Sequence, residues 1–277
     1  MAIAHPAGAA PASQDPASQD IEIRTIGLHD LRMALSQGWQ DFLNKRGDLL
    51  FLGLIYPGVA LLAALVATNT SVLPLAVPVA AGAILLGPAA ASGFYELARR
   101  HELGLDSGWR HFLDAQRGQS ADAMMTLTAM LGLLFLGWIV AAAAISFATI
   151  GVRPFDSAAA FLAAVFATRQ GWEMMIVGNC VGLGFAILAL AMSVVSFPML
   201  VDCPVGVRVA LRTSLRVTAK NPVTIGVWGL TVTALLVLGS LPALVGLGVV
   251  LPVLGYATWH LYTRAVIRPD DQTAVQY

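Results

Sequence analysis

Charged residues divide this chain into long apolar stretches. Asp, Glu, Lys and Arg are missing altogether from residues 49–95, 123–152, 174–201 and 221–263. A transmembrane helix needs about 20 mostly apolar residues to cross a hydrocarbon core about 30 Å thick. The first and last stretches are long enough for two spans each, and turn-forming residues divide them at 68–71 and 239–242. The other two stretches are long enough for one span each.

The pattern therefore predicts an all-α fold, a polytopic bundle of six transmembrane helices. The spans are expected at about 49–67, 72–97, 124–150, 174–200, 223–239 and 243–263. They would form one membrane domain at 23–267, followed by a C-terminal tail at 268–277. Residues 1–22 are rich in Ala, Pro and Ser, and they lack the basic start and apolar core of a signal peptide, so a disordered tail is expected there.

Three amphipathic segments, at about 28–46, 105–118 and 205–220, are too short and too polar to span. In the first, Leu31, Leu35, Trp39 and Phe42 recur at helical spacing, which predicts a helix resting on the bundle or in the membrane plane. The sequence that begins at Gly38-Trp39 partly recurs from Gly108-Trp109. These echoes suggest degenerate copies of one module, an interfacial helix followed by two spans.

Basic residues give the orientation. With the N-terminus inside, every Lys and Arg falls on the cytoplasmic side except Arg153 and Arg169. Cytoplasmic loops of membrane proteins collect Lys and Arg. We therefore expect a multi-pass protein of the bacterial inner membrane with both termini in the cytoplasm.

Ionisable residues gather at the predicted inner ends of the spans. The candidate polar cluster consists of Glu96, His260, Asp202, Arg100 and Arg264. Ionisable groups at membrane depth are candidates for function. Glu96 and His260 each follow a proline by eight residues (Pro88 and Pro252), so a hydrogen bond between them is one prediction. The alternative is that these groups face water, with Tyr95, Tyr256, Trp259 and Tyr262 forming an aromatic belt at the interface.

A basic stripe marks the third amphipathic segment. Its members, four residues apart, are Arg208, Arg212, Arg216 and Lys220. Such a stripe suits the anionic headgroups of membrane lipids, although positive-inside topology alone would also place basic residues here. Membrane lipids are thus the expected partners, and another membrane protein is a second candidate partner. The formal net charge of zero gives no reason to expect nucleic acid binding.

Several blocks of the sequence resemble a family of prokaryotic integral membrane proteins classed as a domain of unknown function. They are Gly38-Trp39 with Phe42, Pro88 with Tyr95-Glu96, residues 193–198, residues 214–216 with Asn221-Pro222, and residues 255–262. The resemblance implies a six-span bacterial membrane protein and implies no activity. Some members carry the label of putative cytochrome c oxidase subunit.

Histidine positions argue against a catalytic oxidase subunit. A haem–copper core needs several imidazoles within the bilayer, and only His260 falls in a predicted span. Enzyme motifs such as HExxH, GxSxG and the Walker loop are missing from the sequence. We expect no enzymatic activity, no metal and no cofactor. The leading hypothesis is a scaffold, assembly or lipid-interacting component. The alternatives are a transporter for a small neutral or hydrophobic compound and an accessory subunit of a respiratory complex.

Overall fold

The computed structural model describes residues 21–44, 78–79, 85, 87–118, 120–151, 155, 157–241 and 245–268. Throughout these residues the only regular elements are helices, with one isolated β-bridge between Ile23 and Val266. The longer helices are α1 (Leu28–Asn44), α5 (Ser92–Glu102), α6 (Ala121–Thr149), α7 (Ala158–Ala167), α8 (Arg169–Ser193), α10 (Val207–Lys220), α11 (Pro222–Ser240) and α12 (Leu247–Ala265). The shorter ones are α4 (Gly87–Ala90), η5 (Trp109–His111), η6 (Asp114–Gln116) and α9 (Ser196–Asp202).

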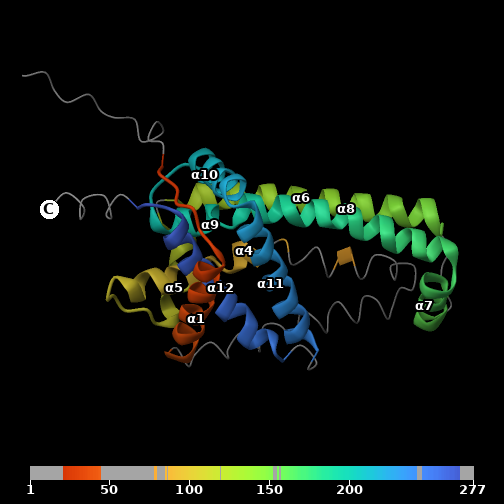
Figure 1. Ribbon diagram of the computed structural model, residues 1–277, viewed down its shortest axis with the longest axis horizontal. Helices are drawn as coiled ribbons and strands as arrows, with labels where there is room; N and C mark the ends of the chain where they lie inside the picture. The colour runs from red at the N-terminus through yellow and green to blue at the C-terminus, as the bar shows by residue number, and fades with distance from the viewer. Residues whose placement is uncertain are drawn as a thin grey trace, which may run out of the picture.

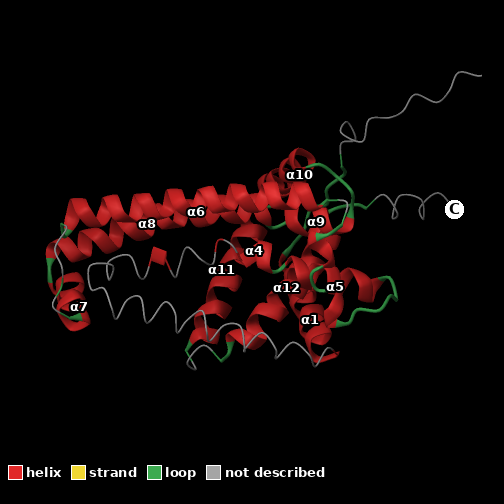
Figure 2. Cartoon of the chain, turned by 180° about the vertical axis from the view of Figure 1, so that it is seen from behind, coloured by secondary structure: helices red, strands yellow, loops and turns green. Residues whose placement is uncertain are grey.

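Two long helices, α6 and α8, run side by side along the longest axis of the molecule (Figures 1 and 2). At one end the short helix α7 packs against the start of α8. At the other end α1, α5, α9, α10 and α12 gather into one packed body, which we call the head. The main hydrophobic core lies in and next to this head.

Three candidate membrane spans are long and apolar enough among the described residues: Ala121–Thr149, Arg169–Asp202 and Pro222–Ser240. They coincide with the third, fourth and fifth predicted spans. The predicted span at 49–67 lies outside the described residues, as do residues 72–77, 80–84 and 86 of the span predicted at 72–97. Helix α12 covers the sixth predicted span but is not among the candidates. The all-α prediction is confirmed for the described residues, whereas six spans remain a prediction.

Helix α12 is unusual because its polar second half is buried by protein. Tyr256, Trp259 and Tyr262 are each 0% exposed, and Tyr95 of α5 is 2% exposed. The predicted aromatic belt at the lipid interface is therefore wrong for these four residues. They pack inside the head, where their rings supply a large apolar area.

Helices α5 and α12 pack closely against each other. The ring of Phe94 meets that of Tyr256 edge-on at 5.4 Å, and further along both helices Trp259 Nε1 donates to Glu102 at 3.1 Å. A Cβ on Gly255 would lie 2.7 Å from Phe94. The two segments that each follow a proline, Pro88 and Pro252, are thus neighbours in the head.

The face of α1 that packs along α12 lies one position away from the face predicted from the sequence. Ala34 and Gly38 are buried, whereas Trp39 is 47% exposed. A Cβ on Gly38 would lie 2.6 Å from the backbone nitrogen of Ala257, so only glycine permits this approach. Asp41 is buried as well. The interfacial location of α1 remains a prediction.

Residues 105–118, predicted as a second interfacial helix, instead form the two 3-10 helices η5 and η6. The backbone at Gly108 is extended (ψ 158°), whereas Gly38 lies within α1. The Gly-Trp echo therefore does not describe one repeated structure. The third amphipathic segment is helical, as α10.

The fourth predicted span is broken near its C-terminal end. Pro198 lacks an amide hydrogen and cannot continue the α8 hydrogen-bond ladder, and the helix breaks at Val194 and Val195 before α9 begins. Ser214 of α10 compensates: its hydroxyl accepts from the Val195 amide at 3.2 Å and donates to the Ala191 carbonyl at 2.7 Å. The break thus fixes α10 against the end of the span.

Small residues permit close packing between α6 and α8 and at the end of the molecule away from the head. A Cβ on Gly182 would touch the Trp138 ring at 3.0 Å, and one on Gly171 would lie 2.1 Å from the Val165 carbonyl of α7. Asn179 donates to the Met175 carbonyl of its own helix. The α7 helix was not predicted, although its residues are uniformly apolar.

Candidate functional site

The most buried charge of the head is Glu96 on α5, which is 3% exposed. Its carboxylate accepts hydrogen bonds from Arg99 Nε and Nη2, both at 2.9 Å, and from Arg100 Nε at 2.7 Å. Spacings of three and four residues place both arginines on the same helix face as Glu96. A carboxylate can be buried only when it is paired in this way, and the hydrogen bond to Glu96 raises the pKa of Arg99.

Arg100 extends the ion pair into the loop after α5. Its Nη2 donates to Asp114 at 3.0 Å, and Nδ1 of His111 lies 2.6 Å from the same carboxylate. The His111 hydrogen bond is the main cause that lowers the pKa of Asp114. Asp106, further along this loop, accepts from the Gly108 amide, which lowers its pKa, and also pairs with Arg110. The chain of ion pairs holds the loop against α5.

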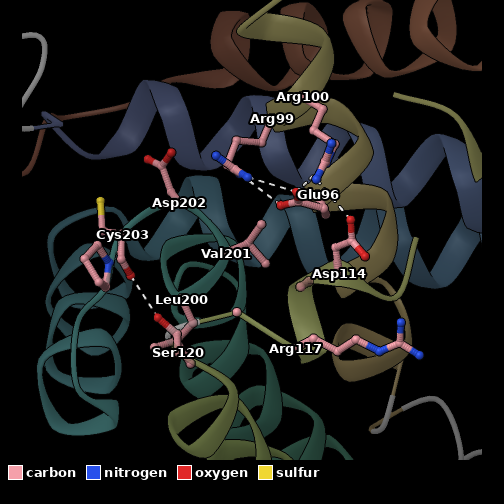
Figure 3. A pocket seen from close by; sticks show the side chains of 13 residues that line it. Glu96, Arg99, Arg100, Asp114, Arg117, Ser120, Leu200, Val201, Asp202 and Cys203 are labelled. Atoms are coloured by element: carbon pink, nitrogen blue, oxygen red, sulfur yellow. Dashed lines mark hydrogen bonds and ion pairs between the residues drawn. The ribbon is translucent and has the colours of Figure 1, made fainter. Parts of the chain in front are cut away.

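Beside this network lies a pocket of about 450 Å³ between α5, η6, the start of α6 and α9 (Figure 3). Its ionisable lining residues are Glu96, Arg99, Arg100, Asp114, Arg117 and Asp202. Leu200 and Val201 give it an apolar wall, and Ser120 closes it by donating to the Cys203 carbonyl at 3.2 Å. The pocket therefore combines both signs of charge with an apolar surface.

Asp202 is the last residue of α9. It accepts one hydrogen bond, from the hydroxyl of the buried Tyr262 at 2.8 Å. Among the described residues it has no basic partner within ion-pair distance. Arg117 lies at the opposite side of the pocket in Figure 3, and its charge contributes to the lowered pKa of Asp114.

A second polar contact joins α1 to α12. His260 Nε2 lies 2.7 Å from Asp41 Oδ2, and His101 Nε2 lies 3.9 Å from the other oxygen of that carboxylate. Arg264, one turn after His260, donates to Gln37 at 2.9 Å and lies 3.7 Å from Asp30. These contacts hold the polar side of α1 on the head.

The structure divides the predicted polar cluster into these two places. Glu96, Arg100 and Asp202 line one pocket, whereas His260 and Arg264 face α1. The predicted hydrogen bond between Glu96 and His260 does not form, because each side chain is directed to a different partner. No group of three or more His, Cys, Asp or Glu suited to a metal occurs within the described ranges.

Sequence reasoning missed Arg99 and Asp41. Arg99 follows Glu96 by three residues, so helical spacing alone could have paired them. Asp41 had no such signal, because its partner His260 is distant in sequence.

The basic stripe lies on the outer face of α10. Arg208, Arg212 and Arg216 line a shallow hollow of about 460 Å³ together with Leu211 and Leu215. Arg208 and Arg212 are exposed. At the other end of the stripe, Arg216 and Lys220 contact the backbone near the N-terminus.

Residues 21–27, which we call the N-terminal strap, cross the junction between α10 and α11. Arg216 Nη1 and Lys220 Nζ donate to strap carbonyls at 3.4 and 2.8 Å. Asn221 is the main anchor: its side chain accepts from the Ile26 amide at 2.9 Å and donates to the Arg24 carbonyl at 3.3 Å. In the sequence Asn221 stood out only as part of a block that carries the family resemblance.

The comparisons with known proteins bear on the family. Neither the curated proteins nor the solved structures contain a match to this chain. One family model matches residues 76–202, which include α5, the pocket-lining loop, α6 and the broken span α8–α9. The resemblance predicted from the sequence is thereby confirmed, and the family that this segment matches is described as "Predicted integral membrane protein (DUF2189)".

Proposed function

We propose that this protein is a non-enzymatic component of the bacterial inner membrane that binds anionic phospholipids through the outer face of α10. In this proposal the head lies at the cytoplasmic surface, and both termini are cytoplasmic. The exposed arginines of α10, beside exposed leucine, are the single observation on which the proposal rests.

The chemistry of α10 supports this assignment. The helix sequence, VRVALRTSLRVTAK, contains no acidic residue, so the positive charge of the stripe is not neutralised within the helix. Arg208 and Arg212 are exposed beside Leu215, which is 42% exposed. Guanidinium groups bind phosphate oxygens in a bidentate manner, and the leucine would contact the acyl region.

The distribution of basic residues supports the orientation. Arginines on α1, α5, α10 and α12 all belong to the head, at one end of α6 and α8 (Figure 1). Arg169 starts α8 at the other end. The cytoplasmic leaflet is the anionic one, and each basic residue near its surface contributes about 1 kcal/mol of attraction.

A lipid-binding measurement on the purified full chain tests the proposal. The probe is a nanodisc or vesicle series with increasing phosphatidylglycerol in phosphatidylcholine. Replacing Arg208→Gln together with Arg212→Gln should weaken the preference for phosphatidylglycerol about tenfold or more. The matched control, Arg32→Gln with Arg169→Gln, removes the same charge elsewhere and should leave the preference nearly unchanged. Equal losses in both pairs would contradict a site on α10.

A membrane-protein partner is part of the same proposal. Purification from native membrane in a mild detergent, followed by identification of the bound proteins and lipids, tests it. Anionic lipids that remain bound to the intact chain but leave the α10 variant would support the lipid assignment. Stoichiometric recovery of a respiratory complex would favour the accessory-subunit hypothesis instead.

A further inference from the structure

We propose that the hollow on α10 binds cardiolipin, a lipid with two phosphates joined by one short bridge, in preference to lipids with one phosphate. This inference rests on the proposed function, because it specifies the lipid class that the same face selects. It follows from the spacing of the arginines, from their surroundings and from the contacts that fix one end of the stripe.

The arginines of the hollow follow one another along one face of the helix. Arg208, Arg212 and Arg216 are four residues apart. Each therefore lies about 6 Å further along the helix axis than the one before, and only about 40° further round it. One phosphate fits between two successive arginines, and the stripe offers two such positions side by side.

The hollow concentrates positive charge. In the described part of the chain its lining comprises the three arginines with Leu211, Leu215 and Ala219, so it includes no acidic group. Like charges four residues apart on a helix repel one another and destabilise it, and α10 itself contains no acidic residue to offset this. A ligand with two phosphates balances more of this charge than a ligand with one.

The leucines favour a lipid over a free phosphate compound. Leu211 and Leu215 line the hollow together with the arginines, and Leu215 is 42% exposed. Apolar side chains beside basic ones are typical of helices that lie at the boundary between headgroups and acyl chains. A free diphosphate in water would gain nothing from these leucines, whereas the acyl chains of a lipid would.

The N-terminal strap fixes one end of the site. Arg216 lines the hollow, and its Nη1 donates to the Ile21 carbonyl at 3.4 Å. Lys220, one turn further, donates to the Ile23 carbonyl at 2.8 Å and is not a lining residue. The strap is itself anchored by Asn221. The last arginine is thus positioned before a ligand arrives, and a preorganised site loses less entropy on binding.

Cardiolipin matches the two positions between the arginines. Its phosphates share one glycerol, so both can be held by neighbouring positions at the same time. Once the first phosphate is bound, binding of the second becomes intramolecular, which raises the affinity without a new kind of contact. Each phosphate accepts charge-assisted hydrogen bonds from guanidinium groups. Phosphatidylglycerol has one phosphate and gains no such advantage.

Competition binding to the purified full chain in detergent, read by native mass spectrometry, tests the inference. Cardiolipin and phosphatidylglycerol are supplied at equal phosphate concentration, with phosphatidylcholine as the reference. We expect cardiolipin to be favoured over phosphatidylglycerol about tenfold. Dilysocardiolipin keeps both phosphates but has two acyl chains, as phosphatidylglycerol does, and it should be favoured to a similar degree.

Two variants that remove the same charge test the spacing. Arg212→Gln leaves arginines about 12 Å apart, with no successive pair, so the preference for cardiolipin should fall to about twofold or less. Arg208→Gln leaves Arg212 and Arg216 as neighbours and should keep most of the preference. Both substituted residues are exposed, and thermal unfolding in detergent verifies that the variants fold. Arg32→Gln on α1 removes an exposed charge elsewhere and should change nothing.

Three results would overturn the inference. The first is equal binding of cardiolipin and phosphatidylglycerol at equal phosphate. The second is an equal loss of preference in Arg212→Gln and Arg208→Gln, which would show that net charge alone matters. The third is a loss of preference with dilysocardiolipin, which would assign it to the acyl chains. In each case a preference of the native chain for phosphatidylglycerol over phosphatidylcholine would leave the proposed function intact, whereas its absence would refute that as well.

Discussion

Single residues decide how closely the helices of the head approach. Gly38 meets the α12 backbone, and Gly255 meets the Phe94 ring, at distances that no side chain would tolerate. Buried charge is the other residue-scale feature, because Glu96 is held by two arginines of its own helix. These contacts belong to the blocks that carried the family resemblance.

Replacing Gly38→Ala should destabilise the head by about 1–3 kcal/mol, the usual cost of overpacking. The added Cβ would lie 2.6 Å from the Ala257 nitrogen, so α1 must move away from α12. The control is Gly184→Ala, where a Cβ meets nothing within 4 Å. Thermal unfolding in detergent measures both; equal melting temperatures in the two variants would show that α1 does not pack as described.

Replacing Glu96→Gln should also destabilise the head, by up to about 3 kcal/mol, because Arg99 and Arg100 lose their shared anion. The cost lies at the low end of the range for buried pairs, since both arginines reach solvent in part. Glu173→Gln breaks an exposed pair with Arg169 and should change stability by less than about 0.5 kcal/mol. Chemical denaturation followed by tryptophan fluorescence compares the two variants.

At the scale of elements, polar contacts help to hold the loop 103–118 and the N-terminal strap, beside the apolar packing of Phe112 and Ile26. Asp106 and Asp114 both have pKa values below the ordinary 3.8. A carboxylate with a lowered pKa stabilises the folded loop while it is ionised, and this stabilisation is lost as the pH falls through the folded pKa.

Hydrogen exchange of the loop 103–118 should therefore be slow at pH 5 and should accelerate, after correction for intrinsic rates, as the pH falls below about 3.8. Asp114→Asn should already show the faster exchange at pH 5, because the contacts of His111 and Arg100 with a carboxylate are lost. Exchange that does not respond to pH in the native chain would mean that the ion pairs do not order the loop.

Replacing Asn221→Ala should release the N-terminal strap. The Ile26 amide and the Arg24 carbonyl would both lose their partner, and a buried group left unsatisfied costs about 1–3 kcal/mol. Asn179→Ala removes an exposed asparagine that bonds only within its own helix. Amide exchange at Ile26 should rise in the first variant only.

The sequence predicted those elements that depend on local pattern. The apolar stretches predicted α6, α8 and α11 closely, since a span is defined by its length and composition. The face of α1 was wrong by one position, because an apolar stripe favours Trp39 while the close contact is made by Gly38. The helix predicted at residues 105–118 was wrong because two short 3-10 turns can show the same spacing of polar residues as an amphipathic helix. The Asp41–His260 contact joins distant parts of the chain, and no local pattern specifies it.

At the scale of the whole molecule, the basic residues and the long apolar helices lie at different positions along one axis. The helices α6 and α8 carry exposed apolar side chains such as Leu133, Leu136 and Leu183, whereas the arginines gather at the head. The lipid site proposed on α10 requires the head to lie at the inner leaflet. The anionic face of that leaflet would attract α10.

Cysteine labelling in intact bacterial cells tests this orientation most directly. In a background carrying Cys180→Ser and Cys203→Ser, a single cysteine is introduced by Ser36→Cys in the head or by Gln170→Cys at the start of α8, both exposed positions. A membrane-impermeant maleimide should label the Gln170→Cys protein in intact cells, and the Ser36→Cys protein only after permeabilisation. Labelling of Ser36→Cys from outside, with Gln170→Cys protected, would contradict the orientation and the lipid site proposed on α10.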